Sequence, residues 1–232
     1  MSKSNGIGEL AESSLHHSLK EYYQTKGAQL EAQLDGYVID VQTPTELIEI
    51  QTSSFSSVKK KYNKLLTNHE IRMVYPIAKK KIIVKHHRDG RIERRKSPKS
   101  GNIFELFREL VYIPKLINHP NFSLEVAFTH EEEIRKNDGK GSWRRKGWSV
   151  TDHKLLEVVD TVKFTCPGDF SRLLPGTLPN EFTTAHITKN LKIPKYMAQK
   201  LVYCLKGMGL LEKIGKDGRY NLYVINQSLN GD

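Results

Sequence analysis

The sequence predicts an α/β protein of two domains, a larger one that mixes helices and strands and a small C-terminal one dominated by helices. Its 232 residues are enough for two such domains. Short runs typical of strands are interspersed with amphipathic helical runs throughout residues 1–147. In residues 148–232, helical runs are followed by two strands around a tight turn. We therefore expect the domain boundary between residues 147 and 148.

The first domain is expected to begin with a helix and three strands. Within residues 9–26, Glu12, His16, Leu19 and Tyr23 fall on one helical stripe. The strands that follow are expected over residues 28–34, 37–42 and 47–51, the first two joined by an Asp-Gly turn.

The later elements follow from the same periodicities. A helix over residues 55–66 has an apolar stripe and several lysines on its other sides. Further elements of the first domain are expected as strands over 71–75, 81–85, 91–95 and 123–129, a helix over 103–117, and a mobile connector over 131–146. The second domain is expected to contain helices over 152–161, 169–174, 185–191 and 196–206, and strands over 210–214 and 219–225.

Acidic residues mark the second and third strands. Asp40 lies in the second strand, and Glu49 and Gln51 project together from one face of the third, because residues two apart in a strand share a face. If the two strands pair, Asp40 reaches the same end of that face. Carboxylate and amide oxygens, with the carbonyl of Ile50 nearby, suit Mg²⁺ or Mn²⁺ rather than zinc. The alternative is the polar face of an ordinary hairpin.

Asp40 followed by Glu49-Ile50-Gln51 resembles the D…(D/E)xK signature of the PD-(D/E)XK nuclease superfamily. The order of helix and three strands is also similar to that family's core. The resemblance implies a restriction-endonuclease-like mixed sheet flanked by helices, and a metal site built by Asp40 and Glu49. Gln51 stands where lysine is commonest in the family, and it would orient water or substrate.

The resemblance also implies roles for residues on the two helices. Glu12, or alternatively Glu9, takes the place of a first-helix glutamate that points at the metal site in this family. Where the motif lysine is missing, a lysine of the following helix can supply the positive charge, and Lys60 and Lys61 are the candidates. Alternatively, these lysines form a solvated face. His16 either orients the site or is a half-buried histidine with ordinary partners.

The end of the chain, FTTAHITKNLKIPKYMAQKLVYCLKGMGLLEKIG, resembles a winged-helix domain. The resemblance implies that Lys195, Gln199 and Lys200 on the second helix enter the major groove of DNA. Lys216 and Arg219 on the hairpin would then meet phosphates or the minor groove. Winged helices also bind other proteins, and that alternative stays open.

Charge is distributed unevenly along the chain. Residues 1–58 hold 3 Lys/Arg and 8 Asp/Glu, a net of −5, whereas residues 59–101 hold 15 and 3, a net of +12. A basic block beside carboxylates suits a site that handles phosphodiesters. A loop within this basic block supplies further candidates for contact with the phosphate backbone of a nucleic acid, namely Arg94, Arg95, Lys96 and Lys99. A solubilising basic surface is the alternative.

A second basic stretch combines aromatic and charged residues. Trp143 and Trp148 flank Arg144, Arg145 and Lys146. Such residues can stack on and clamp a nucleic-acid strand. Equally, the two tryptophans can pin a linker to the domain surface.

Composition limits the remaining possibilities. Two cysteines are too few for a disulfide framework or a zinc site, and no apolar run is long enough for a membrane span. We therefore expect a cytoplasmic, Mg²⁺- or Mn²⁺-dependent endonuclease acting on DNA, double-stranded or branched, without membrane contact and with a homodimer possible. The alternatives are an inactive DNA-binding protein with a nuclease fold and a winged-helix assembly factor.

Overall fold

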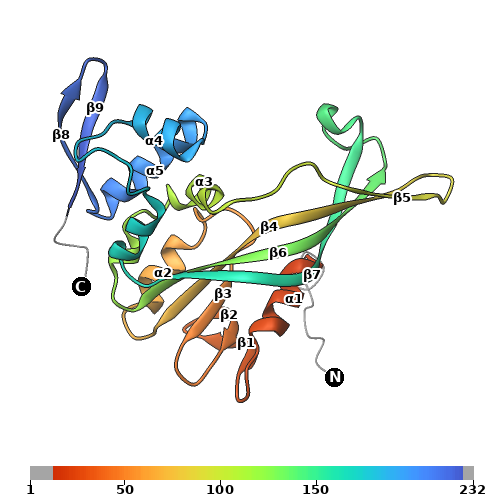
Figure 1. Ribbon diagram of the computed structural model, residues 1–232. Coiled ribbons are helices and arrows are strands. Elements are labelled where there is room, and N and C mark those ends of the chain that lie inside the picture. Colours follow the sequence, from red (N-terminus) through yellow and green to blue (C-terminus); the bar gives the residue numbers. More distant parts are fainter. Residues whose placement is uncertain (1–12, 227–232) are drawn as a thin grey trace.

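A large mixed sheet forms the body of the molecule in the computed structural model, which describes residues 13–226 (Figure 1). Within those residues the sheet has seven strands, in the order β1-β2-β3-β4-β6-β7, with β5 paired to β4. Strands β3, β4 and β6 are parallel neighbours, whereas β1–β2, β2–β3, β4–β5 and β6–β7 are antiparallel pairs. The strands are β1 (Gln29–Leu34), β2 (Tyr37–Gln42), β3 (Leu47–Ile50), β4 (Ile71–His86), β5 (Ile92–Lys96), β6 (Phe122–Asn137) and β7 (Trp148–Phe164).

Helices cover both faces of this sheet, which confirms the expected α/β class with a mixed sheet flanked by helices. The elements outside the sheet are α1 (Ser14–Tyr23), α2 (Lys59–Leu65), η2 (Ile103–Leu106), α3 (Phe107–Leu110), η3 (Leu116–Asn118), η4 (Trp143–Arg145), η5 (Pro167–Leu173), α4 (Thr184–Leu191), α5 (Lys195–Gly207) and the hairpin of β8 (Leu211–Asp217) and β9 (Tyr220–Ile225). Helix α1 packs on the face that carries Ile48 and Ile50, and α2 packs with Leu47 on the other face. All four residues of β3 are therefore buried.

Several predicted elements differ from those observed. The helix expected over residues 152–161 was wrong, because this segment lies in β7 and pairs with β6 along its length. Its valines and threonines are β-branched, which favours a strand when a neighbour is available. The strands expected over 71–75 and 81–85 are one strand, β4, and residues 131–137 continue β6 rather than forming a connector.

The helix expected over residues 103–117 is broken into short pieces. It consists of η2, α3 and η3, with Pro114 between the last two. Proline lacks the N–H that a helix interior requires, so a continuous helix cannot pass through this position. The other predicted helices of the first domain are present but shorter, as α1 and α2.

The C-terminal module contains the predicted helix, turn, helix and hairpin. It shares one continuous core with the sheet: Phe170 stacks on Phe164 at the end of β7, with ring centroids 4.1 Å apart, and meets Phe107 of α3 edge-on. Asn118 donates to the carbonyl of Met208 at 3.1 Å. Because β7 runs to Phe164, the sheet extends beyond the boundary expected after residue 147.

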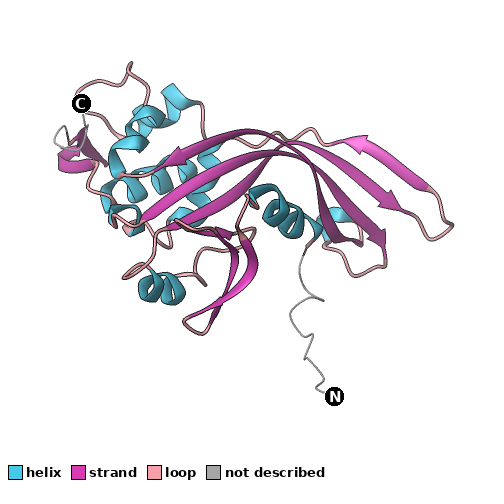
Figure 2. Ribbon diagram, turned by 90° about the horizontal axis from the view of Figure 1, so that it is seen from below, coloured by secondary structure: helices cyan, strands magenta, loops and turns pink. Residues whose placement is uncertain are grey.

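Strands β4, β6 and β7 continue far beyond the short strand β3. Ile50, the last residue of β3, lies opposite Val74, and β4 runs on to His86. At about 3.3 Å per residue this is about 40 Å of additional strand. We call this projection, residues 80–96 and 130–154, the arm. Figures 1 and 2 show it extending away from the C-terminal helices.

A row of buried glutamates on β6 pairs with basic residues of the arm. Glu131, Glu132 and Glu133 are all buried. Their partners are Lys81, 3.4 Å from Glu133 and 4.0 Å from Glu131, together with Arg94 on Glu132 and Arg135 on Glu133. Carboxylates so far from water stay ionised only beside such partners.

Candidate functional site

Asp40 lies where β2 and β3 separate. The two strands pair at Val41 with Ile48 and at Gln42 with Leu47, and no further pairs follow in the described ladder. Beyond that point the Asp40 carboxylate replaces a backbone partner, since its Oδ2 accepts a hydrogen bond from the Ile50 N–H at 2.7 Å. The carboxylate is thereby fixed at the carboxyl end of β3.

Glu49 lies beside Asp40 and faces α2. Its side chain is 9 % exposed, and both carboxylate oxygens accept hydrogen bonds from Lys61 Nζ at 2.7 Å. Lys61 also donates to the carbonyl of Val38. Burial raises the pKa of Glu49 to about 7, even though the Lys61 charge lowers it, and the Asp40 charge adds to the increase.

His16 reaches the same end of β3 from α1, on the opposite face. Its Nε2 lies 2.9 Å from the Ile50 carbonyl oxygen and 3.3 Å from Asp40 Oδ2. Helix α1 is held in place by β7, because Asp152 accepts hydrogen bonds from the N–H and hydroxyl of Ser14 at 3.0 and 2.5 Å. The site is thus built between two helices, one supplying histidine and the other lysine.

Two of the predicted site residues do not join Asp40 and Glu49, and the structure does not describe a third. The Gln51 amide donates to Ser53 Oγ at 3.1 Å and to the Ser54 carbonyl at 2.9 Å, so it is held in the loop after β3. Lys60 is exposed, and its neighbour Lys61 makes the contact with Glu49 instead. Glu12 lies outside the described residues.

The oxygen atoms of this site fit a hard divalent cation. Two carboxylates and the Ile50 carbonyl are the donor types that Mg²⁺ and Mn²⁺ prefer. Glu49 is a buried carboxylate with one cationic partner, and additional positive charge would favour its ionised form. Within residues 13–226, however, no group of three or more His, Cys, Asp and Glu side chains has metal-binding geometry.

Tyr62 adds a buried polar group close to the two acids. It is fully buried on α2, and among the residues described its hydroxyl has no hydrogen-bond partner. Burial, together with the charges of Glu49 and Asp40, raises its pKa well above the usual value. Tyr62 therefore stays a neutral hydroxyl, available as a hydrogen-bond donor.

The basic loop expected to contact DNA divides into two parts. Arg94 is paired with Glu132, and Arg95 is exposed on β5. Lys96 and Lys99 line a groove of about 430 Å³ with Lys79 and Lys80, where the register of β4 shifts against β6. Sequence reasoning missed Lys79 and Lys80, because only folding brings them beside the loop. We call these four lysines the lysine groove, and none forms an ion pair with a carboxylate among residues 13–226.

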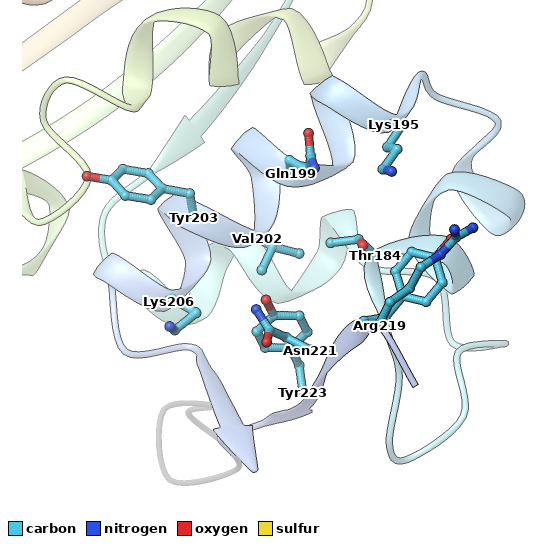
Figure 3. Close-up of a pocket in the computed structure, with 10 residues that line it drawn as sticks. Thr184, Lys195, Gln199, Val202, Tyr203, Lys206, Arg219, Asn221 and Tyr223 are labelled. Atoms are coloured by element: carbon cyan, nitrogen blue, oxygen red, sulfur yellow. The ribbon is translucent and has the colours of Figure 1, made fainter. Parts of the chain in front are cut away.

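The residues of the C-terminal module that were predicted to bind DNA lie in different places. Lys195, Gln199 and Arg219 line a groove of about 490 Å³ between α5 and β9 (Figure 3). Tyr203, Lys206 and Tyr220 also line it. Lys216 is exposed on β8.

Two residues of α5 contact the sheet domain, and one of them, Lys200, was expected to contact DNA. Lys200 Nζ donates to the Arg108 carbonyl at 3.0 Å, and Arg108 donates to the Tyr196 hydroxyl at 3.2 Å. Lys200 is therefore part of the contact between α5 and the short helix α3. Local sequence patterns gave no indication of this contact, because its partner lies about ninety residues away.

Comparison with known proteins gives a family and a relative. A family model described as "Domain of unknown function (DUF8091)" matches residues 13–165. A protein of Treponema pallidum (strain Nichols), described as "Uncharacterized protein", is 35% identical over 178 residues, which cover 76% of this chain and 71% of the relative. No solved structure matches the chain significantly. In the part of the chain that the structure describes, no helix has the length and apolar character needed to cross a bilayer.

Proposed function

The chain belongs to the DUF8091 family, a domain of unknown function, and we propose that it is a metal-dependent DNA endonuclease. The observation that carries the proposal is the meeting of Asp40 and Glu49 at the carboxyl end of β3, with Lys61 at 2.7 Å from Glu49. Two acids that can hold a metal and a lysine that can stabilise negative charge are groups suited to phosphodiester hydrolysis.

The arrangement of elements supports a restriction-endonuclease-like fold for the sheet domain. Helix α1 precedes three antiparallel strands, with Asp40 on the second and Glu49-Ile50-Gln51 spanning the end of the third. Strands β4 and β6 continue the sheet in parallel with β3. In the same way α4, α5 and the β8–β9 hairpin support a winged-helix fold for the C-terminal module.

The proposed roles follow from the contacts of each group. Asp40, Glu49 and the Ile50 carbonyl would hold Mg²⁺ or Mn²⁺. When bound, the metal supplies an acidified water and neutralises charge on the scissile phosphate. Lys61 supplies the positive charge that Gln51 cannot, and His16 holds the Ile50 carbonyl in position.

A nucleic acid is the substrate that matches the charge of the surface. The lysine groove and the groove between α5 and β9 both present lysines or arginines to solvent. Such contacts with phosphates are sequence-independent and weaken steeply as salt increases. We propose double-stranded or branched DNA, and cleavage of both strands would require a homodimer or two successive cuts.

A plasmid assay tests this function. Supercoiled plasmid is incubated with protein in Mg²⁺ or Mn²⁺, beside Asp40→Asn, Glu49→Gln and Lys61→Met proteins. We expect nicking that requires metal, disappears in both acid variants, and falls by about 10²–10³ in Lys61→Met because a charge near the reacting phosphate is lost. The matched control is Lys60→Met, one residue away on α2 and exposed, which should cleave normally.

A second candidate, DNA binding without cleavage, is favoured by one observation. Lys61 already neutralises Glu49, and the Gln51 amide is held in the following loop. This candidate predicts that plasmid is retarded on a gel but is never cut. Branched and single-stranded DNA should likewise be bound and remain intact. Cleavage that persisted in both acid variants would instead contradict the site proposed here.

A further inference from the structure

The loop that joins β6 to β7, residues 138–147, has a defined structure at the end of the arm. The Gly141 N–H donates to the Gly147 carbonyl at 3.2 Å, and the Lys146 N–H donates to the Trp143 carbonyl at 3.0 Å. Gly141 is tightly enclosed, since a Cβ there would come within 1.9 Å of the Trp148 carbonyl oxygen. These contacts give the loop a defined shape. We call it the arm loop.

The two tryptophans of this region lie in different environments. Trp148 is partly buried against the arm, with its ring edge-on to His87 at 4.9 Å and Lys85 Nζ 5.2 Å from its centroid. Trp143 is 82 % exposed, more than the other large apolar side chains that the structure describes as exposed. Trp148 thus pins the hairpin, and Trp143 is presented to solvent.

One face of the Trp143 ring already has a cationic partner. The Arg144 guanidinium lies 5.5 Å from the ring centroid. A flat ring with a cation on one side and solvent around it can accept a second flat group by stacking. Nucleobases are such groups, and their backbone carries the complementary charge.

The charge of the arm loop is strongly positive. It contains four basic residues and one acidic residue, Asp138, a net of +3. Asp138 accepts hydrogen bonds from the Ser149 hydroxyl at 2.7 Å and the Lys140 N–H at 3.0 Å, so its charge is engaged within the hairpin. The basic side chains are all exposed: Lys140, Arg144, Arg145 and Lys146.

We propose that the arm loop binds unpaired nucleotides, with a base stacked on Trp143 and the adjoining phosphates held by the basic residues. The proposal rests on the proposed function for nucleic acid as the partner, and deepens it by adding a single-strand contact. An anionic membrane would also attract these charges. Trp143 is, however, the only large apolar residue in the arm loop, whereas stable membrane binding needs more buried apolar surface.

The position of the loop gives this contact a distinct role. About 40 Å of strand separates the level of Glu49 from the end of β4. The arm loop would therefore hold DNA well away from the proposed site of cleavage. A substrate with an unpaired segment beside a duplex would contact the arm loop and the proposed site of cleavage at the same time.

Fluorescence of single-tryptophan proteins tests the proposal, because the chain has only two tryptophans. In a Glu49→Gln background with EDTA, Trp148→Phe leaves Trp143 as the reporter, and Trp143→Phe leaves Trp148 as the matched control. Titration with oligothymidylate should quench Trp143 and leave Trp148 nearly unchanged. Because neither metal nor cleavage is involved, failure of the nuclease function would not affect this result.

Affinity measurements provide an independent readout. Trp143→Ala should weaken oligothymidylate binding about tenfold, since one base loses its stacking partner. Replacing Arg144, Arg145 and Lys146 by glutamine should reduce the slope of log affinity against log salt by about 2. The thermal midpoint should stay unchanged in Trp143→Ala, because this side chain is exposed.

Two results would overturn the proposal. One is an unquenched Trp143 together with unchanged affinity in Trp143→Ala. The other is a spectral shift with phosphatidylserine vesicles and none with oligothymidylate, which would identify the arm loop as a membrane contact.

Discussion

At the scale of single residues, ionisation of the buried Glu49 carboxyl lowers the stability of the folded protein. Burial raises its pKa to about 7 in the folded protein, from an ordinary value of 4.5. A pKa raised by folding contributes stability that is fully present below the unfolded value and is lost as pH rises through the folded value. The folded protein should therefore lose stability between about pH 4.5 and pH 7.

This cost can be measured by removing the charge. In EDTA, Glu49→Gln should be more stable than the unmodified protein at pH 8.5, by up to about 3 kcal/mol, and about equally stable at pH 4.5. Urea denaturation at the two pH values measures the difference. A difference that does not change with pH would show that Glu49 titrates normally.

At the scale of elements, a side chain of a distant strand anchors the start of α1. Asp152 of β7 accepts two hydrogen bonds from Ser14 at the start of α1, and α1 carries His16. Asp152→Ala should lower the free energy of unfolding by about 1–3 kcal/mol. It should also reduce plasmid cleavage, because His16 loses its fixed position.

A second variant of β7 separates this effect from general damage to the strand. Asp160 is exposed on the same strand, so Asp160→Ala should change stability by less than about 0.5 kcal/mol. Thermal denaturation and the plasmid assay are compared for the two proteins. Equal effects of the two substitutions would mean that the contact with Ser14 does not position α1.

The motif strands could be predicted from the sequence, whereas several other elements could not. The alternation of residues in β2 and β3 is local, and it correctly indicated that Glu49 and Ile50 face opposite sides. The strand β7 could not be told from a helix, because pairing with β6 decides its conformation. Likewise, three consecutive lysines begin α2, and only the packing of that helix selects the third, Lys61, for contact with Glu49.

At the scale of the whole molecule, the shared core predicts that both parts unfold together. Phe170 lies at the junction and is fully buried against Phe164 and Phe107. Phe170→Ala should lower the free energy of unfolding by about 3–5 kcal/mol. The change should affect the sheet and the C-terminal module alike, because neither has a complete core without the other.

Two probes test this cooperativity. Far-UV circular dichroism reports on all elements, whereas tryptophan fluorescence reports on the arm, where both tryptophans lie. We expect coincident urea transitions in the unmodified protein and a common shift in Phe170→Ala. The control Tyr112→Ala removes an aromatic ring that is 52 % exposed, and should shift neither transition appreciably. Separate transitions for the two probes would show that the arm unfolds independently.

The buried glutamates of β6 restrict how the arm can change during evolution. Each has a basic partner on the sheet: Arg94 of β5, one strand beyond β4, for Glu132, and Lys81 of the adjacent strand β4 for Glu133. Loss of Arg94 would leave Glu132 as a buried charge without its ion-pair partner, which is costly. We therefore expect descendants that keep the arm to exchange Glu132 and Arg94 together, whereas the exposed basic residues of the arm loop can change one at a time.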